Sequence, residues 1–163
     1  EAAFMYAYGT SEAKIFVLSN DSQGNCNGVW SAAHLTGYNA YMVTGRMTAG
    51  DYDGDGKDEI AAMYDYGNAT MRIHVFDITE GVETSSWSEW YVELNPGWYN
   101  AEKATDRMTS GDFDGDGKDE IAVMYDYDDY TLRLNVFKTN STNNGFDFAI
   151  WYQTTAYHPL CVT

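Results

Sequence analysis

Short apolar runs separated by turn-forming residues recur along this chain. In its middle part the runs are IAAMYDY (60–66), MRIHVFDI (71–78) and SSWSEWYVEL (85–94). Runs of this length, rich in aromatic and β-branched residues and broken by glycine, proline or asparagine, predict β-strands. Together with the run that ends at Ala49-Gly50, they predict a unit of four short antiparallel strands.

The same unit occurs again. Its later copy consists of IAVMYDY (121–127), TLRLNVFK (131–138) and FDFAIWYQ (146–153). At the N-terminus, EAAFMYAYG (1–9) matches EIAAMYDYG (59–67) at six of nine positions, but no first strand precedes it. The tryptophans Trp30, Trp90 and Trp151 are predicted to occupy one position of the three units and to pack between neighbouring sheets.

These repeats predict an all-β chain with a single repeat region over residues 1–163. The predicted boundaries are a partial first repeat (1–40), a second repeat (41–101), a third repeat (102–158) and the start of a further repeat (159–163). The last boundary depends on Cys161-Val162-Thr163, which falls in register with Met42-Val43-Thr44. The region therefore holds two complete units and one incomplete unit.

Composition narrows the classes of partner. The formal net charge is −16, with only nine Lys and Arg residues, which argues against nucleic acid as a partner. No apolar run approaches the roughly 20 residues of a membrane span, so membrane insertion is not expected. Fourteen Tyr, fifteen Gly and only two Pro favour β structure.

The longest repeated segments, 46–66 and 107–127, differ at only three positions and contain an Asp-aromatic-Asp-Gly-Asp-Gly-Lys loop. Ca²⁺ takes about six to eight oxygen ligands, so alternate acidic residues in a tight loop are suited to it. Gly54 and Gly56 would permit the positive φ values that the turn requires. The predicted ligands of the two Ca²⁺ sites are Asp51, Asp53, Asp55, Lys57 (through its backbone carbonyl) and Glu59, and then Asp112, Asp114, Asp116, Lys118 (likewise) and Glu120.

Two other interpretations of these loops fit the sequence less well. A plain Asp-Gly turn explains one copy but not two with fixed acidic spacing. An EF-hand needs a bidentate Glu at its twelfth position and flanking helices, whereas those positions hold Ala62 and Val123 within strand-like sequence. Asp58 and Asp119 compete with the neighbouring glutamates for the role of closing ligand.

The segments GDYDGDGKDEI (50–60) and GDFDGDGKDEI (111–121) resemble the signature of the FG-GAP/VCBS repeat family, with Glu in place of Asp at the ninth loop position. The resemblance implies four-stranded blades of a calcium-bearing β-propeller, similar to the integrin α-subunit head, in which the loop joins the first and second strands of a blade. Propellers have about four to eight blades, so three blades would require others to close a ring.

The sequence predicts no enzyme, because His34, His74 and His158 lie in unrelated contexts and no catalytic motif is present. The first hypothesis is a secreted calcium-binding module that recognises a glycan or an extracellular protein. Tyr38, Trp98 and Tyr157 are predicted to share a position near a turn and to stack on a sugar. An extracellular location is expected because weak calcium loops are filled by millimolar calcium.

Two alternatives stay open. One is a structural extracellular subunit that assembles head to tail through open sheet edges into a homo-oligomeric ring or a filament. The other is an accessory region of a secreted hydrolase. Cys26 and Cys161 permit one disulfide, and two buried free thiols fit the sequence equally well. Sequons at Asn20, Asn68 and Asn140 leave glycosylation open.

Overall fold

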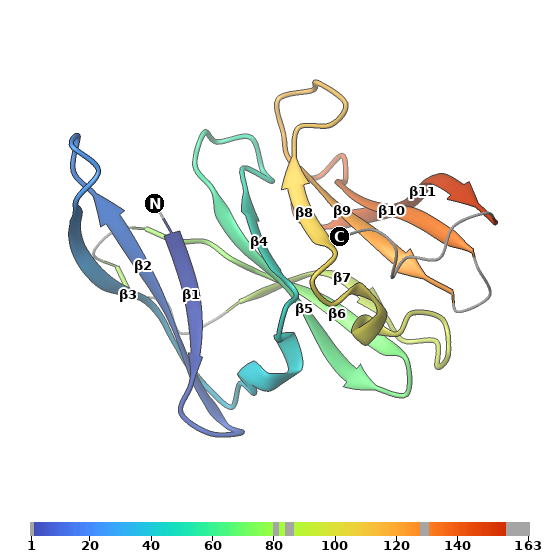
Figure 1. Ribbon diagram of the computed structural model, residues 1–163, viewed down its shortest axis with the longest axis horizontal. Helices are drawn as coiled ribbons and strands as arrows, with labels where there is room; N and C mark the ends of the chain where they lie inside the picture. The colour runs from blue at the N-terminus through green and yellow to red at the C-terminus, as the bar shows by residue number, and fades with distance from the viewer. Residues whose placement is uncertain (1, 80–81, 84–86, 128–130, 156–163) are drawn as a thin grey trace.

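The computed structural model describes residues 2–79, 82–83, 87–127 and 131–155, and this part of the chain is all-β (Figure 1). The strands are β1 (Ala2–Ala7), β2 (Glu12–Asn20), β3 (Cys26–Thr36), β4 (Met47–Gly50), β5 (Glu59–Gly67), β6 (Thr70–Phe76), β7 (Ser88–Glu93), β8 (Met108–Gly111), β9 (Glu120–Asp126), β10 (Leu132–Thr139) and β11 (Phe146–Thr154). Two short 3-10 helices, η1 (Ala40–Val43) and η2 (Ala101–Ala104), precede β4 and β8.

The strands form three antiparallel sheets, each built from consecutive segments of the chain. The first sheet is β1-β2-β3, the second is β4-β5-β6-β7 and the third is β8-β9-β10-β11. The two predicted four-stranded units are confirmed, and the N-terminal unit has three strands in the described residues. Within each sheet, each strand pairs antiparallel with the next strand of the chain, as in hairpins.

All three sheets share a β-bulge at the same place. The pairing of the last two strands shifts after Ile15 in the first sheet, after Ile73 in the second and after Leu134 in the third. In the second and third sheets the extra residue is Trp90 and Trp151, respectively. An inserted residue bends its strand and increases the local twist. The three units therefore share a backbone irregularity as well as sequence similarity.

The bulge also corrects one prediction. Trp30 lies opposite Val17 in the pairing of β2 with β3, two residues before the bulge position of the first sheet. Trp30 is therefore not equivalent to Trp90 and Trp151. The tryptophans of the later units also differ from each other, because Trp90 packs against the core whereas Trp151 is 43 % exposed.

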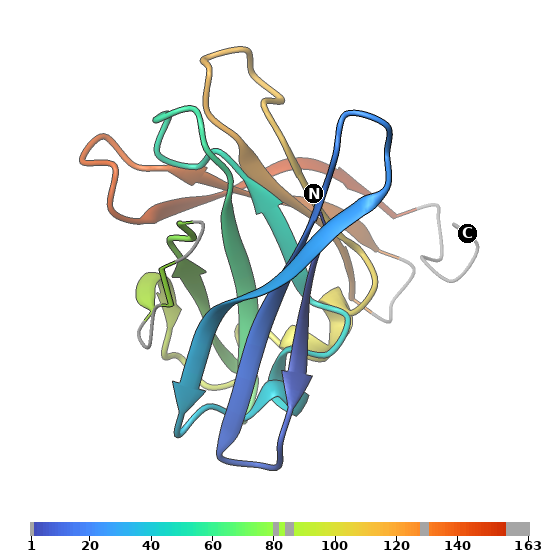
Figure 2. The same cartoon turned by 90° about the vertical axis from the view of Figure 1, so that its left-hand side faces the viewer.

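Apolar side chains fill two layers between successive sheets. Ile15 and Leu35 of the first sheet meet Phe76 of the second, and Ile73 of the second sheet meets Phe137 of the third. The two views show the sheets one behind another along the longest axis of the molecule (Figures 1 and 2). Each sheet buries apolar positions against its neighbour, which is the main stabilisation expected for stacked sheets.

The strands β4 and β8 bring the second and third sheets together at one side. Thr48 Oγ1 lies 2.8 Å from Ser110 Oγ, and Ser110 Oγ also donates to the carbonyl of Ala49. The loops that follow these two strands therefore leave the sheets side by side, at the upper end of the molecule in Figure 1.

Two further predictions concern cysteine and the membrane. Cys26 is exposed and its thiol is free, so the alternative of a buried thiol is wrong at that residue. Cys161 lies outside the described residues. In the described ranges there is no helix with the length and apolar character needed to span a bilayer.

Candidate metal centres

The first acidic loop joins β4 to β5 and wraps around the carboxylate of Asp51. Its Oδ1 accepts from the N–H of Gly54 and its Oδ2 from the N–H of Gly56, both at 2.8 Å. The φ angles of these glycines are +82° and +87°, in the region that glycine adopts without strain. The predicted need for glycine at both positions is confirmed.

The second loop joins β8 to β9 and repeats this arrangement. Asp112 Oδ1 accepts from Gly115 N–H at 2.7 Å and from Asp116 N–H at 3.0 Å, while its Oδ2 accepts from Gly117 N–H at 3.1 Å. Two loops with nearly the same sequence thus reach the same conformation, because the backbone donors that fold them are supplied within each loop.

Each loop gathers three of its predicted ligands. Side-chain oxygens of Asp51, Asp53 and Glu59, and those of Asp112, Asp114 and Glu120, all lie within 4.8 Å of one another in their respective groups. We call these groups the first cluster and the second cluster. Three carboxylates around one point form an all-oxygen donor set of the kind that hard cations prefer.

The other predicted ligands lie at the rim of the loops. Asp55 accepts from Lys57 N–H at 2.9 Å and from Lys57 Nζ at 3.3 Å, and Asp116 accepts from Lys118 N–H at 3.0 Å. The coordination proposed for the backbone carbonyls of Lys57 and Lys118 stays a prediction.

The closing glutamates are buried beneath the loops. Glu59 Oε2 accepts from Tyr52 N–H and Glu120 Oε2 from Phe113 N–H, each at 3.0 Å. The second oxygen of Glu120 is buried and has no hydrogen-bond partner among the described residues. A buried carboxylate oxygen without a partner is costly, and a cation bound in the cluster would remove that cost.

The pKa values of both glutamates are raised, so their ionised forms are disfavoured without a bound cation. Burial raises the pKa of Glu59 to about 7, with the carboxylates of Asp53, Asp51 and Asp55 acting in the same direction and the hydrogen bond from Tyr52 acting against it. Burial also raises the pKa of Glu120. A divalent cation beside such a group favours its charged form, so the clusters suit a cation chemically as well as in shape.

The two loops are bonded to each other. The N–H of Asp119 donates to the carbonyl of Asp51 at 2.9 Å, and the N–H of Asp51 donates to Asp119 Oδ2 at 3.1 Å. The sequence offers Asp119 as an alternative closing ligand of its own loop. Its carboxylate instead holds the neighbouring loop, and Glu120 is the acidic residue that faces the second cluster.

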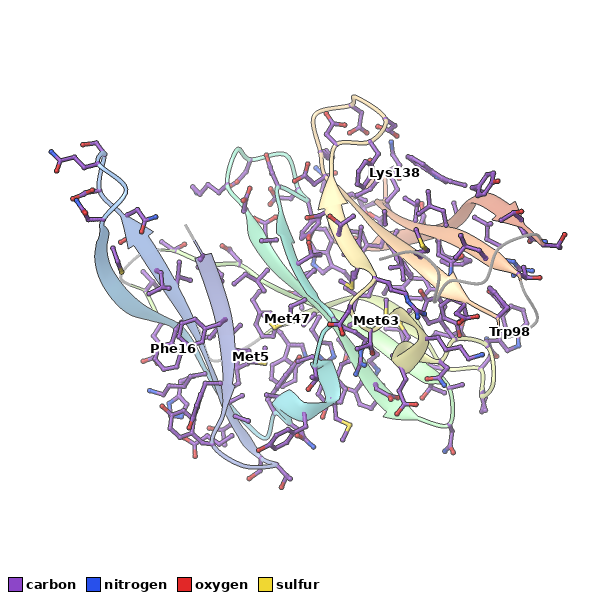
Figure 3. All side chains as sticks on the ribbon, in the orientation of Figure 1. Met5, Phe16, Met47, Met63, Trp98 and Lys138 are labelled. Atoms are coloured by element: carbon purple, nitrogen blue, oxygen red, sulfur yellow. The ribbon has the colours of Figure 1, made fainter. Side chains whose placement is uncertain are left out.

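Lys138, at the end of β10, makes the second cluster different from the first. Its Nζ donates to Asp114 Oδ2 and to Asp116 Oδ2, the latter at 2.9 Å, and lies 4.0 Å from Glu120 Oε1 (Figure 3). The hydrogen bonds to Asp114 and Asp116 raise the pKa of Lys138, which keeps it charged. Sequence analysis missed this residue, although the repeat alignment shows lysine where the preceding unit has Asp77.

The predicted aromatic ligand site is not formed as expected. Trp98 is 72 % exposed at the periphery (Figure 3), whereas Tyr38 is 1 % exposed, and Tyr157 lies outside the described residues. The ring of Tyr38 packs against Tyr64 and Trp87, and its hydroxyl lies 3.1 Å from His74 Nδ1. Tyr38 therefore offers no open ring to a sugar.

The reason for this error is a shift of one residue in the repeat alignment. Tyr38 precedes the N-cap Asn39 of η1 as Tyr99 precedes the N-cap Asn100 of η2. Tyr99 is also buried, and its ring packs against Tyr125 as that of Tyr38 packs against Tyr64. Tyr99, not Trp98, is the counterpart of Tyr38, and Trp98 is an exposed residue outside the repeated pattern.

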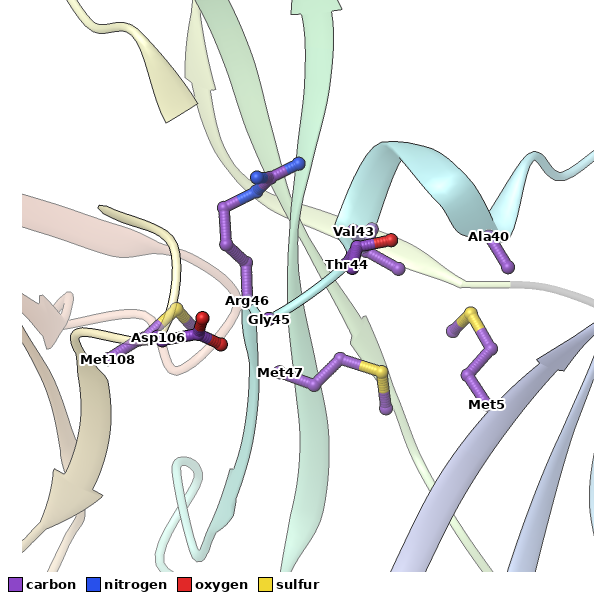
Figure 4. A pocket seen from close by; sticks show the side chains of 9 residues that line it. All are labelled: Met5, Ala40, Val43, Thr44, Gly45, Arg46, Met47, Asp106 and Met108. Carbon is purple, nitrogen blue, oxygen red and sulfur yellow. The ribbon is translucent and has the colours of Figure 1, made fainter. Parts of the chain in front are cut away.

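A pocket of about 550 Å³ is lined by residues of all three sheets, among them Met5, Met47 and Met108 (Figure 4). Arg46 lines it, but its donors are used elsewhere: Nη2 donates to Met42 O and Nη1 to Thr105 Oγ1, both at 2.7 Å. The guanidinium therefore joins η1 to the segment after η2 rather than presenting free donors to a ligand.

Comparisons of the chain with family models, with curated proteins and with solved structures gave no match. The functional argument consequently depends on the sequence and on the geometry described above.

Proposed function

We propose that this protein is a secreted, non-catalytic calcium-binding module in which each acidic cluster holds one Ca²⁺. The observation that carries the proposal is the buried Oε1 of Glu120, which accepts no hydrogen bond from the described residues although Glu120 belongs to the second cluster. An ion there would satisfy that oxygen and offset the repulsion among the three carboxylates.

Calcium suits these sites better than other common cations. The clustered donors are all carboxylate oxygens, without the His or Cys ligands that zinc and copper favour. Ca²⁺ accepts a larger and less regular coordination shell, which a short loop can supply, while Mg²⁺ demands a nearly ideal octahedron. Millimolar calcium outside the cell would fill sites of modest affinity, which supports the secreted location.

The proposed architecture is a segment of a β-propeller of the FG-GAP/VCBS type. Three sheets in chain order stack face to face, with a calcium-type loop between the first and second strands of both four-stranded sheets. The common bulge position supports treatment of the sheets as equivalent blades. About four to eight blades complete a propeller, so other blades would be needed for closure.

The calcium proposal is tested by melting experiments with and without calcium. A ligand that binds only the folded state raises the melting temperature by mass action. Asp53→Ala and Asp114→Ala should each reduce the calcium-dependent rise, and the double variant should abolish it. Calorimetric melting in chelator and in millimolar calcium measures this, and an unchanged calcium-dependent rise in the double variant would remove the assigned ligands.

Recognition of a glycan is the role that the exposed aromatic surface favours. Trp98 lines a pocket of about 340 Å³ with Tyr127, Arg133 and Phe148. The guanidinium of Arg133 lies 4.2 Å from the centre of the Tyr127 ring. Aromatic faces beside a polar group are suited to sugars. Trp98→Ala should therefore remove binding seen on a glycan array, and an array without any hit for the calcium-loaded protein would exclude this role.

Head-to-tail assembly is a second candidate, favoured by the outer faces of the stack. Phe4 pairs with Phe16 in the first sheet as Ala62 pairs with His74 in the second. Ala62 and His74 are fully buried against the first sheet, whereas Phe4 is 44 % exposed. A second copy of the chain, stacked through its third sheet, would cover this face as the sheets cover each other within one copy.

A further inference from the structure

Lys138 Nζ lies against the second cluster, at carboxylates that a bound cation would also use. It contacts a carboxylate oxygen of Asp114 and of Asp116, and it lies 4.0 Å from the otherwise unpartnered Oε1 of Glu120. The side chain of Lys138 is 38 % exposed, so one side of it is open to solvent. An ammonium group in this place neutralises part of the charge that a bound metal ion would neutralise.

The first cluster has the opposite arrangement at the equivalent position. Phe76 pairs with Ile60 in the second sheet as Phe137 pairs with Ile121 in the third. The residue that follows Phe76 is Asp77, which is exposed, and the residue that follows Phe137 is Lys138. The repeat therefore places a negative charge beside the first loop and a positive charge inside the second, although the loops are almost identical.

We propose that Lys138 is a tethered cation that competes with Ca²⁺ for the second cluster and so divides the two sites into a stronger and a weaker one. The inference rests on the proposed calcium function. A divalent ion and an ammonium group cannot share the same carboxylates at contact distance, because like charges repel strongly there. Calcium enters the second cluster only when the Lys138 side chain swings out into solvent. In the first loop the lysine, Lys57, contacts Asp55 rather than the clustered Asp51, Asp53 or Glu59.

The consequence is a graded response to calcium. At low calcium the first loop is loaded, and the second loop is held by its own lysine. At higher calcium Lys138 is released and becomes a free positive charge on a strongly acidic surface. The second loop is thus ordered both with Lys138 and with calcium. When calcium is scarce, the lysine offsets the repulsion among the carboxylates and so stabilises the folded protein.

Calorimetric titration with CaCl₂ of the full chain tests the proposal. Wild type should show two unequal sites. Lys138→Met, which removes the charge and keeps most of the apolar stem, should strengthen the weaker site by about tenfold or more and leave the stronger one unchanged. Lys138→Arg, which keeps the charge, should leave the weaker site weak. Asp77→Lys should weaken the first site, since it places a lysine at the equivalent position.

A second readout follows the lysine itself. In protein with ¹³C-methylated lysines, the Lys138 signal, assigned by its loss in Lys138→Arg, should shift only as the weaker site fills. Equal sites that Lys138→Met does not alter, or a Lys138 signal that ignores calcium, would overturn the role of Lys138 alone. No calcium binding by either wild type or Lys138→Met would instead overturn the proposed calcium function, so the two failures are distinguishable.

Discussion

His74 shows how a repeat position acquires a different chemistry in each unit. It is fully buried beneath Tyr38 and Trp87, and its counterpart in the third sheet is the buried Asn135. Burial lowers the pKa of His74 from 6.5 to about 4, with Arg72 acting in the same direction and Glu89 against it. The imidazole is therefore neutral near pH 7, and it stabilises the interface of the first and second sheets as an aromatic ring.

A pH dependence of stability follows. Between pH 6.5 and about 4 unfolded His74 binds a proton that the folded residue does not, so the free energy of unfolding falls as the pH is lowered through this window. The loss attributable to His74 is at most about 3 kcal/mol, from 1.36 kcal/mol per pKa unit. Denaturant unfolding at several pH values should show that the free energy of unfolding changes less with pH in His74→Asn than in wild type. An identical pH dependence in the two proteins would contradict the assignment.

Residue-level prediction from sequence succeeded where the signal was local. The spacing of Asp51, Asp53 and Glu59 was enough to predict a cluster, because one short loop supplies all three. It failed for Asp119 and Lys138, whose contacts join segments distant in the chain. The burial of Tyr38 was recoverable, since the tripeptide Tyr-Asn-Ala occurs at both 38–40 and 99–101 and fixes the alignment.

At the scale of elements, the contact between the two loops depends on a small residue at the end of β4. A Cβ on Gly50 would lie 2.5 Å from Asp119 Oδ2 and 2.8 Å from Asp119 Cβ. A Cβ on the counterpart Gly111 would meet only the ring of Phe113, at 3.3 Å. The glycine is thus required in the second sheet by the loop of the third sheet.

Gly50→Ala should therefore destabilise the protein more than Gly111→Ala. Overpacking typically costs about 1–3 kcal/mol, and displacement of Asp119 also weakens its bonds to Asp51. The difference in stability is measured from the denaturant midpoints of the two variants, provided that the dependence of the unfolding free energy on denaturant is unchanged. Equal losses in the two variants would show that the loop contact contributes little to stability.

The strands were predictable because their apolar runs are short and bounded by turns, and the repeat supplied each pattern more than once. The bulges were not predictable, since an extra residue in one strand is visible only in its pairing with another. The same limitation misplaced Trp30, whose register depends on that pairing.

At the scale of the whole molecule, the outer faces of the stack lead to a prediction about assembly. If a second copy covers the first sheet, the mass measured by light scattering should rise with concentration in millimolar calcium. Phe4→Lys should keep the protein monomeric because it places a charge on the apolar face. Tyr41→Lys, at an exposed aromatic on η1 and so outside the strands of the first sheet, is the matched control. A wild type that stays monomeric throughout would exclude self-assembly.

Anomalous diffraction from crystals grown in saturating calcium tests the central claim most directly. The account predicts one calcium peak in each acidic cluster, about 2.3–2.6 Å from carboxylate oxygens of Asp51, Asp53 and Glu59 and of their counterparts Asp112, Asp114 and Glu120. It also predicts that Lys138 Nζ has left the second cluster. Crystals that bind calcium at neither cluster, with the acidic loops folded as described here, would contradict it.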